Sequence, residues 1–140
     1  MLKIAFDNNI LLDAIANRAD YKTAQKLFMA VADEKITGII SANTITDIYY
    51  ISRKILGDKD ARKAILNLLT LFEVVPVDEE ACLTALNTPM SDFEDSVLAV
   101  CALNSGADYI VTRDKDFIAS TESPVEALSP FDILKIISNY

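Results

Sequence analysis

Residues 92–117, DFEDSVLAVCALNSGADYIVTRDKDF, contain the pattern that decides the fold. An acidic start leads into an apolar segment with helical spacing, and Gly106 stands where a glycine ends a helix. A short, continuous apolar run at 108–112 follows, with the length and composition of a buried strand. The segment therefore predicts a helix that leads into a buried strand, with Asp114 just past the end of that strand.

The same alternation runs along the rest of the chain. Continuous apolar runs, typical of parallel strands covered on both faces, predict strands at 2–7, 36–41, 73–77, 108–112 and, more weakly, 125–128. Helical patterns lie at 10–17, 21–34, 43–56, 59–71, 79–87, 92–105 and 130–138. This order predicts an α/β fold, a three-layer α/β/α sandwich with a central parallel sheet of about five strands. We find no repeat or linker and expect one domain over 1–140.

Local signals mark several helix ends. Gly57 is placed to end the helix that precedes it. Ser129 followed by Pro130 predicts an N-cap and a first helical position. Ser91 and Glu94 have the spacing of a capping box at the start of the helix in 92–105.

Composition narrows the class of protein. Hydrophobic residues make up 51% of the chain and charged residues 24%, which suits a globular core. No apolar stretch approaches the roughly 18 residues that cross a bilayer. The first strand begins directly after Met1, which leaves no room for a signal peptide. We therefore expect a cytoplasmic protein that does not enter the membrane.

The absence of histidine limits the available chemistry. It excludes Ser-His-Asp and Cys-His nucleophile schemes and most zinc sites. The two cysteines, Cys82 and Cys101, lie among alanines and leucines and are interpreted as free buried thiols. Catalysis, if present, must use carboxylates, hydroxyls, amides, lysine or arginine.

Acidic residues gather where the predicted strands end. Asp7 closes the first strand and Asp114 follows the fourth. Asp92 and Asp95 begin the helix before the fourth strand, and Asp47 lies near the start of the helix after the second. Sites in open parallel sheets form outside the carboxyl ends of the strands, so we expect these acids at one edge.

Each acid also has a purely structural interpretation. Asp7 could cap the helix that follows it, Asp47 could close a capping box with Thr44, and Asp114 could open a turn before Phe117. Caps are common and contribute about 1 kcal/mol each. No single acid therefore identifies a site.

The combination of acids is more informative than any one of them. Two carboxylates 4 Å apart repel by about 4 kcal/mol at an effective dielectric constant near 20. Shared protons or a bound divalent cation must offset that repulsion, and an oxygen-only set without histidine or cysteine selects Mg²⁺ or Mn²⁺. Such a site suits phosphodiester hydrolysis, with Asn9 and Thr112 as neutral groups beside the acids.

Net charge alone argues against a nucleic-acid substrate. The chain has 21 acidic and 13 basic residues and a formal net charge of -8, whereas polyanions bind to basic surfaces. The objection weakens when several carboxylates hold divalent cations, because they no longer act as bare negative charge.

Four stretches of this sequence resemble the PIN-domain ribonucleases, which include the VapC-like toxins of type II toxin–antitoxin pairs. They are IAFDNNILLDAI (4–15), ISANTITDIYYISRK (40–54), the segment 92–117 and VEALSP (125–130). The order of acid, apolar helix, Gly-Ala-Asp, buried strand and Thr-Arg-Asp in 92–117 is the most specific. The resemblance covers essentially the whole chain and implies a PIN-like fold and an endoribonuclease that uses Mg²⁺ or Mn²⁺.

The resemblance also assigns roles to individual residues. The acidic quartet of the family, which binds the metal and carries the catalysis, falls on Asp7, Asp47, Asp95 and Asp114, with Asp92 as second choice to Asp95. Asn9 and Thr112 match the supporting amide and hydroxyl. Asp116 matches the aspartate of the common Asp-Phe pair, where we expect it to cap or turn the chain.

Two positions depart from the family pattern. Asn8 replaces the usual small hydroxyl residue, which is a mild change. Asp47 replaces the usual glutamate and is one methylene shorter, which could leave its carboxylate about 1 Å short of a direct ligand position.

Substrate and partner predictions are less specific. Arg113 and Lys115 flank Asp114 and are our first candidates for contacts with an RNA backbone, followed by Arg53 and Lys54. Arg62 and Lys63 could join them, but a solvated helix face is the better interpretation of this pair. The resemblance implies a cognate antitoxin and a homodimer as partners, for which the apolar strip that includes Tyr49, Tyr50 and Ile51 is a candidate surface.

Two alternatives remain. A catalytically degenerate PIN module would bind RNA or protein without cleaving, and Asp47 is the feature that favours it. A receiver-like signalling domain also gathers acids at strand ends, but it needs a lysine at the end of a late strand, where this chain has none.

Overall fold

Five short strands form one sheet in the computed structural model, which describes residues 1–139. The strands are β1 (Lys3–Phe6), β2 (Thr37–Ser41), β3 (Glu73–Val75), β4 (Tyr109–Val111) and β5 (Ala127–Leu128). They lie in the order β3-β2-β1-β4-β5, and each of the four pairings is parallel. The structure thus confirms the predicted α/β fold with a five-stranded parallel sheet.

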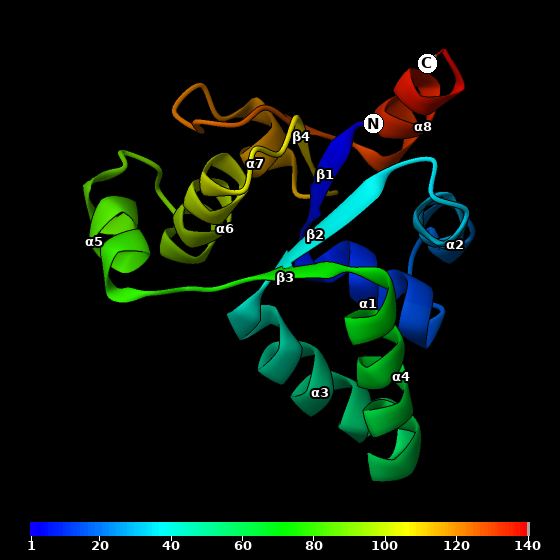
Figure 1. Cartoon of the computed structure of the whole chain (residues 1–140). Coiled ribbons are helices and arrows are strands. Elements are labelled where there is room, and N and C mark those ends of the chain that lie inside the picture. Colours follow the sequence, from blue (N-terminus) through cyan, green and yellow to red (C-terminus); the bar gives the residue numbers. More distant parts are fainter. Residues whose placement is uncertain (140) are drawn as a thin grey trace.

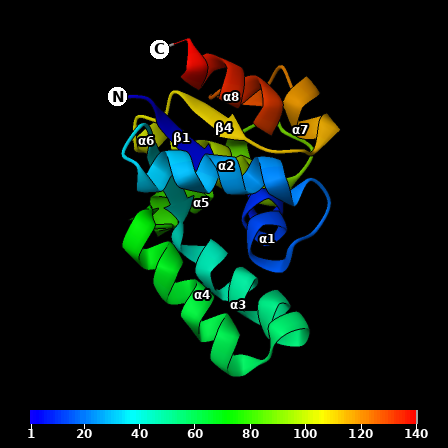
Figure 2. The same cartoon turned by 90° about the vertical axis from the view of Figure 1, so that its right-hand side faces the viewer.

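Helices cover both faces of this sheet (Figure 1). They are α1 (Asn8–Ala16), α2 (Tyr21–Ala32), α3 (Ala42–Leu56), α4 (Asp58–Leu71), α5 (Glu79–Asn87), α6 (Phe93–Asn104), α7 (Lys115–Ala119) and α8 (Pro130–Ser138). Both views show α3 and α4 as a hairpin that extends away from the sheet (Figures 1 and 2).

Alternating side chains of β1 build the two halves of the core. Ile4 and Phe6 point to the face that α1, α2 and α8 cover, and Ala5 points to the face that α6 and α7 cover. On the first face, Phe6, Phe28 and Phe72 pack edge to face, with ring centroids 4.9 to 6.3 Å apart. The central strand is therefore buried on both sides, as its continuous apolar run predicts.

The strand order places a topological switch between β1 and β4. The chain moves from β1 outward to β2 and β3 and then returns to β4 on the other side of β1. Phe6 pairs with Val111 in the last register of the two strands, and the amide of Asp7 donates to the Val111 carbonyl at 3.0 Å. Asp7 and Thr112 thus leave the sheet side by side, where ligands bind in open α/β sheets.

The predicted elements are confirmed with small shifts of their ends. Gly57 and Gly106 follow α3 and α6 with positive φ values of 86° and 74°. The Ser129 side chain accepts from the Asp132 amide and Pro130 opens α8. The short helix α7 has five residues, too few for a helical period to stand out in the sequence.

Two predicted capping boxes are wrong. Asp92, not Ser91, caps α6, and its carboxylate accepts from the Asp95 amide at 3.0 Å. At the start of α3, Ser41 is the N-cap residue without a side-chain cap, and Thr44 bonds to neighbours outside the helix instead. At α6 the Asp92 carboxylate takes the capping role that Ser91 was expected to have. At α3 the Thr44 hydroxyl donates to Asn8 of α1 instead of capping its own helix.

Two further expectations concern cysteines and membranes. Both cysteines are free, but only Cys101 is buried as expected, whereas Cys82 is half-buried. No helix within residues 1–139 has the length and apolar character needed to cross a membrane.

Candidate active site

Asp7 is held by a frame of three donors at the end of β1. Its Oδ1 accepts from the Asn8 amide at 2.8 Å, which makes it the N-cap of α1. Its Oδ2 accepts from Thr112 Oγ1 at 2.8 Å and from Asn9 Nδ2 at 3.2 Å. Asp7 is therefore both a helix cap and a member of the strand-end cluster, so the two interpretations do not exclude each other.

Asn8 links this frame to Asp47 on α3. Its Nδ2 donates to Asp47 Oδ2 at 3.3 Å, and its Oδ1 accepts from Thr44 Oγ1 at 2.8 Å. A hydroxyl residue at this position could not make both contacts, because it lacks the reach and the paired donor and acceptor of an amide. The substitution that looked mild in the sequence thus bridges two elements beside Asp47.

Asp114 and Asp92 sit at the starts of α7 and α6. Asp114 Oδ1 accepts from the Asp116 amide at 2.9 Å, and the Asp114 amide donates to Thr112 Oγ1 at 3.1 Å. Asp92 caps α6 from the same position in its helix. Asp116, which we expected to cap or turn the chain, instead follows the cap and is exposed in the first turn of α7.

Asp95 lies among these acids, and its carboxylate differs from theirs in its hydrogen bonding. Within residues 1–139 no side chain or amide donates to its half-buried carboxylate. Burial raises its pKa to about 7, with further contributions from the charges of Asp92, Asp7 and Asp114 and then Glu94. Electrostatic interactions thus join Asp95 to Asp7, Asp92 and Asp114.

The pKa of Asp7 is also raised, for a different balance of reasons. Burial is the largest cause, and the hydrogen bonds from Thr112 and Asn8 oppose it by favouring the charged form. The charges of Asp114 and Asp92 add to the upward shift. Raised carboxylate pKa values in a shared cleft are typical of functional sites.

Two neighbouring clefts meet at Asp95. One, of about 30 Å³, is lined by Asp7, Asn8, Ser41, Asn43, Thr44, Asp47, Glu94, Asp95 and Leu98. The other, of about 200 Å³, is lined by Met90, Ser91, Asp92, Asp95, Asp114, Asp116, Phe117 and Ser120. Glu94 was not predicted as a site residue, because its spacing suggested a cap. Larger clefts elsewhere, such as that between α1 and α4, are mainly apolar and lack the converging carboxylates.

The donor chemistry of the cluster fits a hard divalent cation. Its side chains offer carboxylate and hydroxyl oxygens, and burial, followed by repulsion from the neighbouring carboxylates, already raises the pKa of Asp95. In the part of the chain that the structure describes, no three acidic or cysteine side chains are arranged so that they could hold a metal ion. The cluster therefore offers suitable ligand types but not an assembled cage.

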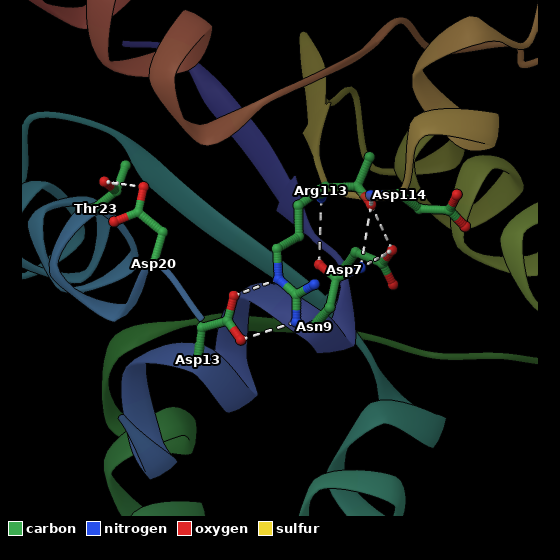
Figure 3. A network of polar contacts seen from close by, with 8 residues as sticks. Asp7, Asn9, Asp13, Asp20, Thr23, Arg113 and Asp114 are labelled. Atoms are coloured by element: carbon green, nitrogen blue, oxygen red, sulfur yellow. Dashed lines mark hydrogen bonds and ion pairs between the residues drawn. The ribbon is translucent and has the colours of Figure 1, made fainter. Parts of the chain in front are cut away.

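Arg113 is directed away from the acids. Its guanidinium forms two bonds with Asp13 of α1, from Nε to Oδ2 at 2.6 Å and from Nη2 to Oδ1 at 3.0 Å (Figure 3). The hydrogen bond to Asp13 raises the pKa of Arg113 further. Lys115, by contrast, is exposed at the start of α7 beside Asp114, and Arg53 and Lys54 are exposed in the last turn of α3.

A family model for the PIN domain matches residues 3–116, which include all four acids of the proposed quartet. The chain belongs to the PIN-domain family. This confirms the resemblance seen in the sequence. No curated protein sequence matches the chain.

The fold is also similar to solved bacterial structures. VapBC2 from Rickettsia felis, bound to a DNA fragment from its promoter, has a TM-score of 0.69 at 16% identity, over 91% of this chain and 98% of that chain. DNA-bound VapBC from Salmonella typhimurium has a TM-score of 0.67 at 19% identity, and the match covers 93% of this chain and 99% of that chain. Mycobacterium tuberculosis VapC20, a sarcin–ricin loop cleaving toxin, has a TM-score of 0.70 at 18% identity, and the match covers 87% of this chain and 98% of that chain. At these identities the likeness concerns the fold.

Proposed function

We propose that this chain, as one domain over 1–140, is an endoribonuclease that hydrolyses RNA phosphodiester bonds with Mg²⁺ or Mn²⁺. The observation that carries the proposal is the cluster of acids from four segments at the β1–β4 switch, centred on Asp95 with a pKa raised to about 7. Membership of the PIN-domain family supports the same chemistry. Folding does not gather like charges in a cleft without a compensating ligand or proton.

In this proposal each acid has a distinct part. Asp7, Asp95 and Asp114 would supply the ligands once a bound cation draws their carboxylates together, and Asp47 would join them directly or through a water in the 30 Å³ cleft. A bound Mg²⁺ or Mn²⁺ supplies a water of lowered pKa and neutralises phosphate charge. Thr112 and Asn9 keep the Asp7 carboxylate oriented through their hydrogen bonds.

Basic residues near the cluster would contact the RNA backbone. Lys115 follows Asp114 and is exposed, and Lys54 lies seven residues after Asp47, on the same side of α3. Arg53 is exposed beside Lys54. These side chains provide local positive charge in a protein whose net charge is -8.

A toxin role with an antitoxin partner is part of the same proposal. Two of the similar structures are VapBC complexes, and VapC20 is described as a toxin. The exposed apolar side chains of α3, Tyr50, Ile51 and Ile55, would serve a homodimer or an antitoxin contact. A short neighbouring reading frame that encodes a DNA-binding antitoxin would support this role.

The second candidate is a PIN module that binds RNA or protein without cleaving it. Asp47 favours it, because its shorter side chain is held by Asn8 at 3.3 Å and has less reach than glutamate. The other three acids of the quartet are present, which favours the nuclease.

The test is cleavage of a single-stranded and a hairpin RNA by the purified chain with Mg²⁺, with Mn²⁺ and with a chelator. We expect metal-dependent cleavage that falls about 100-fold or more in Asp95→Asn. Asp33→Asn is the matched control, since Asp33 is exposed at the end of α2, far from the carboxyl ends of the strands. RNA binding without cleavage under all conditions would favour the non-cutting module, and equal cleavage by Asp95→Asn would overturn the assignment of this site.

A further inference from the structure

The structure contains an ion pair that links the two segments carrying Asp7 and Asp114. Asp13 lies on α1, which begins directly after Asp7, and Arg113 directly precedes Asp114. The Arg113 guanidinium meets the Asp13 carboxylate with two bonds of 2.6 and 3.0 Å, a bidentate arrangement (Figure 3). We propose that this pair positions Asp114 against Asp7 rather than binding substrate.

Burial makes Asp13 the anchor of the pair. Its side chain is 2% exposed, whereas that of Arg113 is 39% exposed. A buried carboxylate without a partner is strongly unfavourable, so the arginine must stay on it whenever α1 is folded. Within residues 1–139 Arg113 is the basic residue in ion-pair contact with Asp13. The arginine is therefore held by the fold and is not free to follow an RNA backbone.

The pair is the outermost of a series of contacts between α1 and the β4–α7 connection. Closest to the sheet, Thr112 Oγ1 donates to Asp7 Oδ2 at 2.8 Å. Next, the Arg113 amide approaches Asn9 Oδ1 at 3.4 Å, a weaker contact. The Asp13–Arg113 pair, one helical turn farther along α1, adds a third contact to the connection. Asp114 directly follows these contacts, and its own amide donates to Thr112 Oγ1 at 3.1 Å, so they fix the backbone from which its carboxylate approaches Asp7.

Lysine cannot reproduce this contact, although it keeps the charge. An ammonium group is a single compact donor centre, whereas the planar guanidinium meets both carboxylate oxygens at once. Arg113→Lys therefore separates two roles. A positioning role is lost with the paired geometry, but a phosphate contact is largely retained with the charge.

The inference rests on the proposed nuclease function, so the first readout is independent of activity. Amide hydrogen exchange is measured on the metal-free full chain for wild type, Asp13→Asn, Arg113→Lys and the double variant, well below each melting midpoint. We expect exchange in 112–116 to accelerate about 10-fold or more in both single variants, and the double variant to add little, since one contact is lost in each case. Asp58→Asn, which disrupts the exposed Asp58–Arg62 pair, is the matched control and should leave this segment unchanged.

The second readout is the kinetics of RNA cleavage. Positioning predicts that kcat falls about 10- to 100-fold in both single variants while KM changes little. A substrate-binding arginine predicts instead a raised KM in Arg113→Ala, little effect in Arg113→Lys, and no loss in Asp13→Asn. The second pattern would overturn the proposal, and so would unchanged exchange in 112–116 or an unchanged kcat in both single variants.

Failure of the nuclease proposal gives a different result. If the wild type neither cleaves RNA nor binds Mn²⁺, that function is wrong and hydrogen exchange alone decides the role of the pair. Acceleration confined to 112–116 would then support positioning of this connection. Acceleration spread over α1 and the sheet would overturn it in favour of a pair that only stabilises the fold.

Discussion

Asp7 and Asp95 lie in the same acidic cluster but in opposite kinds of surroundings. The Asp7 carboxylate accepts three hydrogen bonds from Asn8, Asn9 and Thr112. The Asp95 carboxylate accepts none from residues 1–139, and burial, with added repulsion from neighbouring acids, raises its pKa to about 7. The fold therefore supplies Asp7 with donors and leaves Asp95 to be satisfied by a proton or a cation.

The largest expected effect concerns Mn²⁺. A cation that binds only the folded state at a hundredfold excess over its Kd should stabilise the wild type by about 2.7 kcal/mol. Asp95→Asn should lose this stabilisation, because it removes the carboxylate that accepts no hydrogen bond from residues 1–139 and is therefore available to the cation. Thermal melts with and without Mn²⁺ measure it, with Asp33→Asn as control. An equal shift in Asp95→Asn and wild type would show that Asp95 is not a ligand.

The next effect tests the frame around Asp7. Thr112→Val keeps the shape of this fully buried side chain but removes the hydroxyl that donates to Asp7 and accepts from the Asp114 amide. We expect a loss of about 2 kcal/mol in the free energy of unfolding, because two polar groups lose a partner. Urea denaturation measures it. Thr37→Val is the control, since the Thr37 hydroxyl contacts only the sulfur of Met1; equal losses in the two variants would contradict the frame.

A smaller effect should appear in the pH dependence without metal. The pKa of Asp95 is raised on folding, so protonation favours the native state. Its contribution is fully present below the unfolded pKa near 4 and is lost as pH rises through about 7. The free energy of unfolding of Asp95→Asn should therefore rise relative to that of the wild type by about 1–2 kcal/mol between pH 4 and 8, after allowance for solvent screening. Denaturation at both pH values with a chelator measures the difference, and a constant difference would contradict the raised pKa.

The smallest effect is expected when Asp47 loses its side-chain donor, as Asp95 already lacks one among residues 1–139. Asn8→Ala removes the amide that donates to Asp47 and accepts from Thr44. We expect a cost of about 0.5–1 kcal/mol, because the contact to Asp47 is long and the site is only half-buried. Denaturation measures it, and Asn43→Ala, which changes an exposed asparagine of α3, is the control. If Asn8→Ala costs no more than the control, Asn8 does not support Asp47.

The predicted architecture was accurate because its signals are local. Continuous apolar runs such as 2–7 and 36–41 appear as β1 and β2, and glycines end the helices where expected. The helix α7 escaped prediction because five residues carry no readable period. The capping boxes at Ser91 and Thr44 were wrong because other partners compete for the same groups, which spacing alone does not reveal.

The site was predictable in part. Asp7 and Asp114 could be placed at one edge, since parallel strands end there, and Asp7 directly follows β1 while Asp114 lies three residues past β4. Asp95 was preferred to Asp92 on the family resemblance, since both lie in one helical turn and spacing does not separate them. Asp92 caps α6, whereas Asp95 lines both clefts, so Asp95 stays the preferred prediction.

The sequence by itself determined the order of strands and helices, the parallel sheet and the identity of the acids near its carboxyl edge. These depend on hydrophobic period and on residues close in the chain. The partner of each polar group depends on the tertiary structure: Arg113 pairs with Asp13 and Asn8 with Asp47, whereas no donor within residues 1–139 reaches the Asp95 carboxylate. Such pairings join residues up to 100 positions apart. They depend on differences of a few tenths of an ångström in hydrogen-bond distance, which no local pattern encodes.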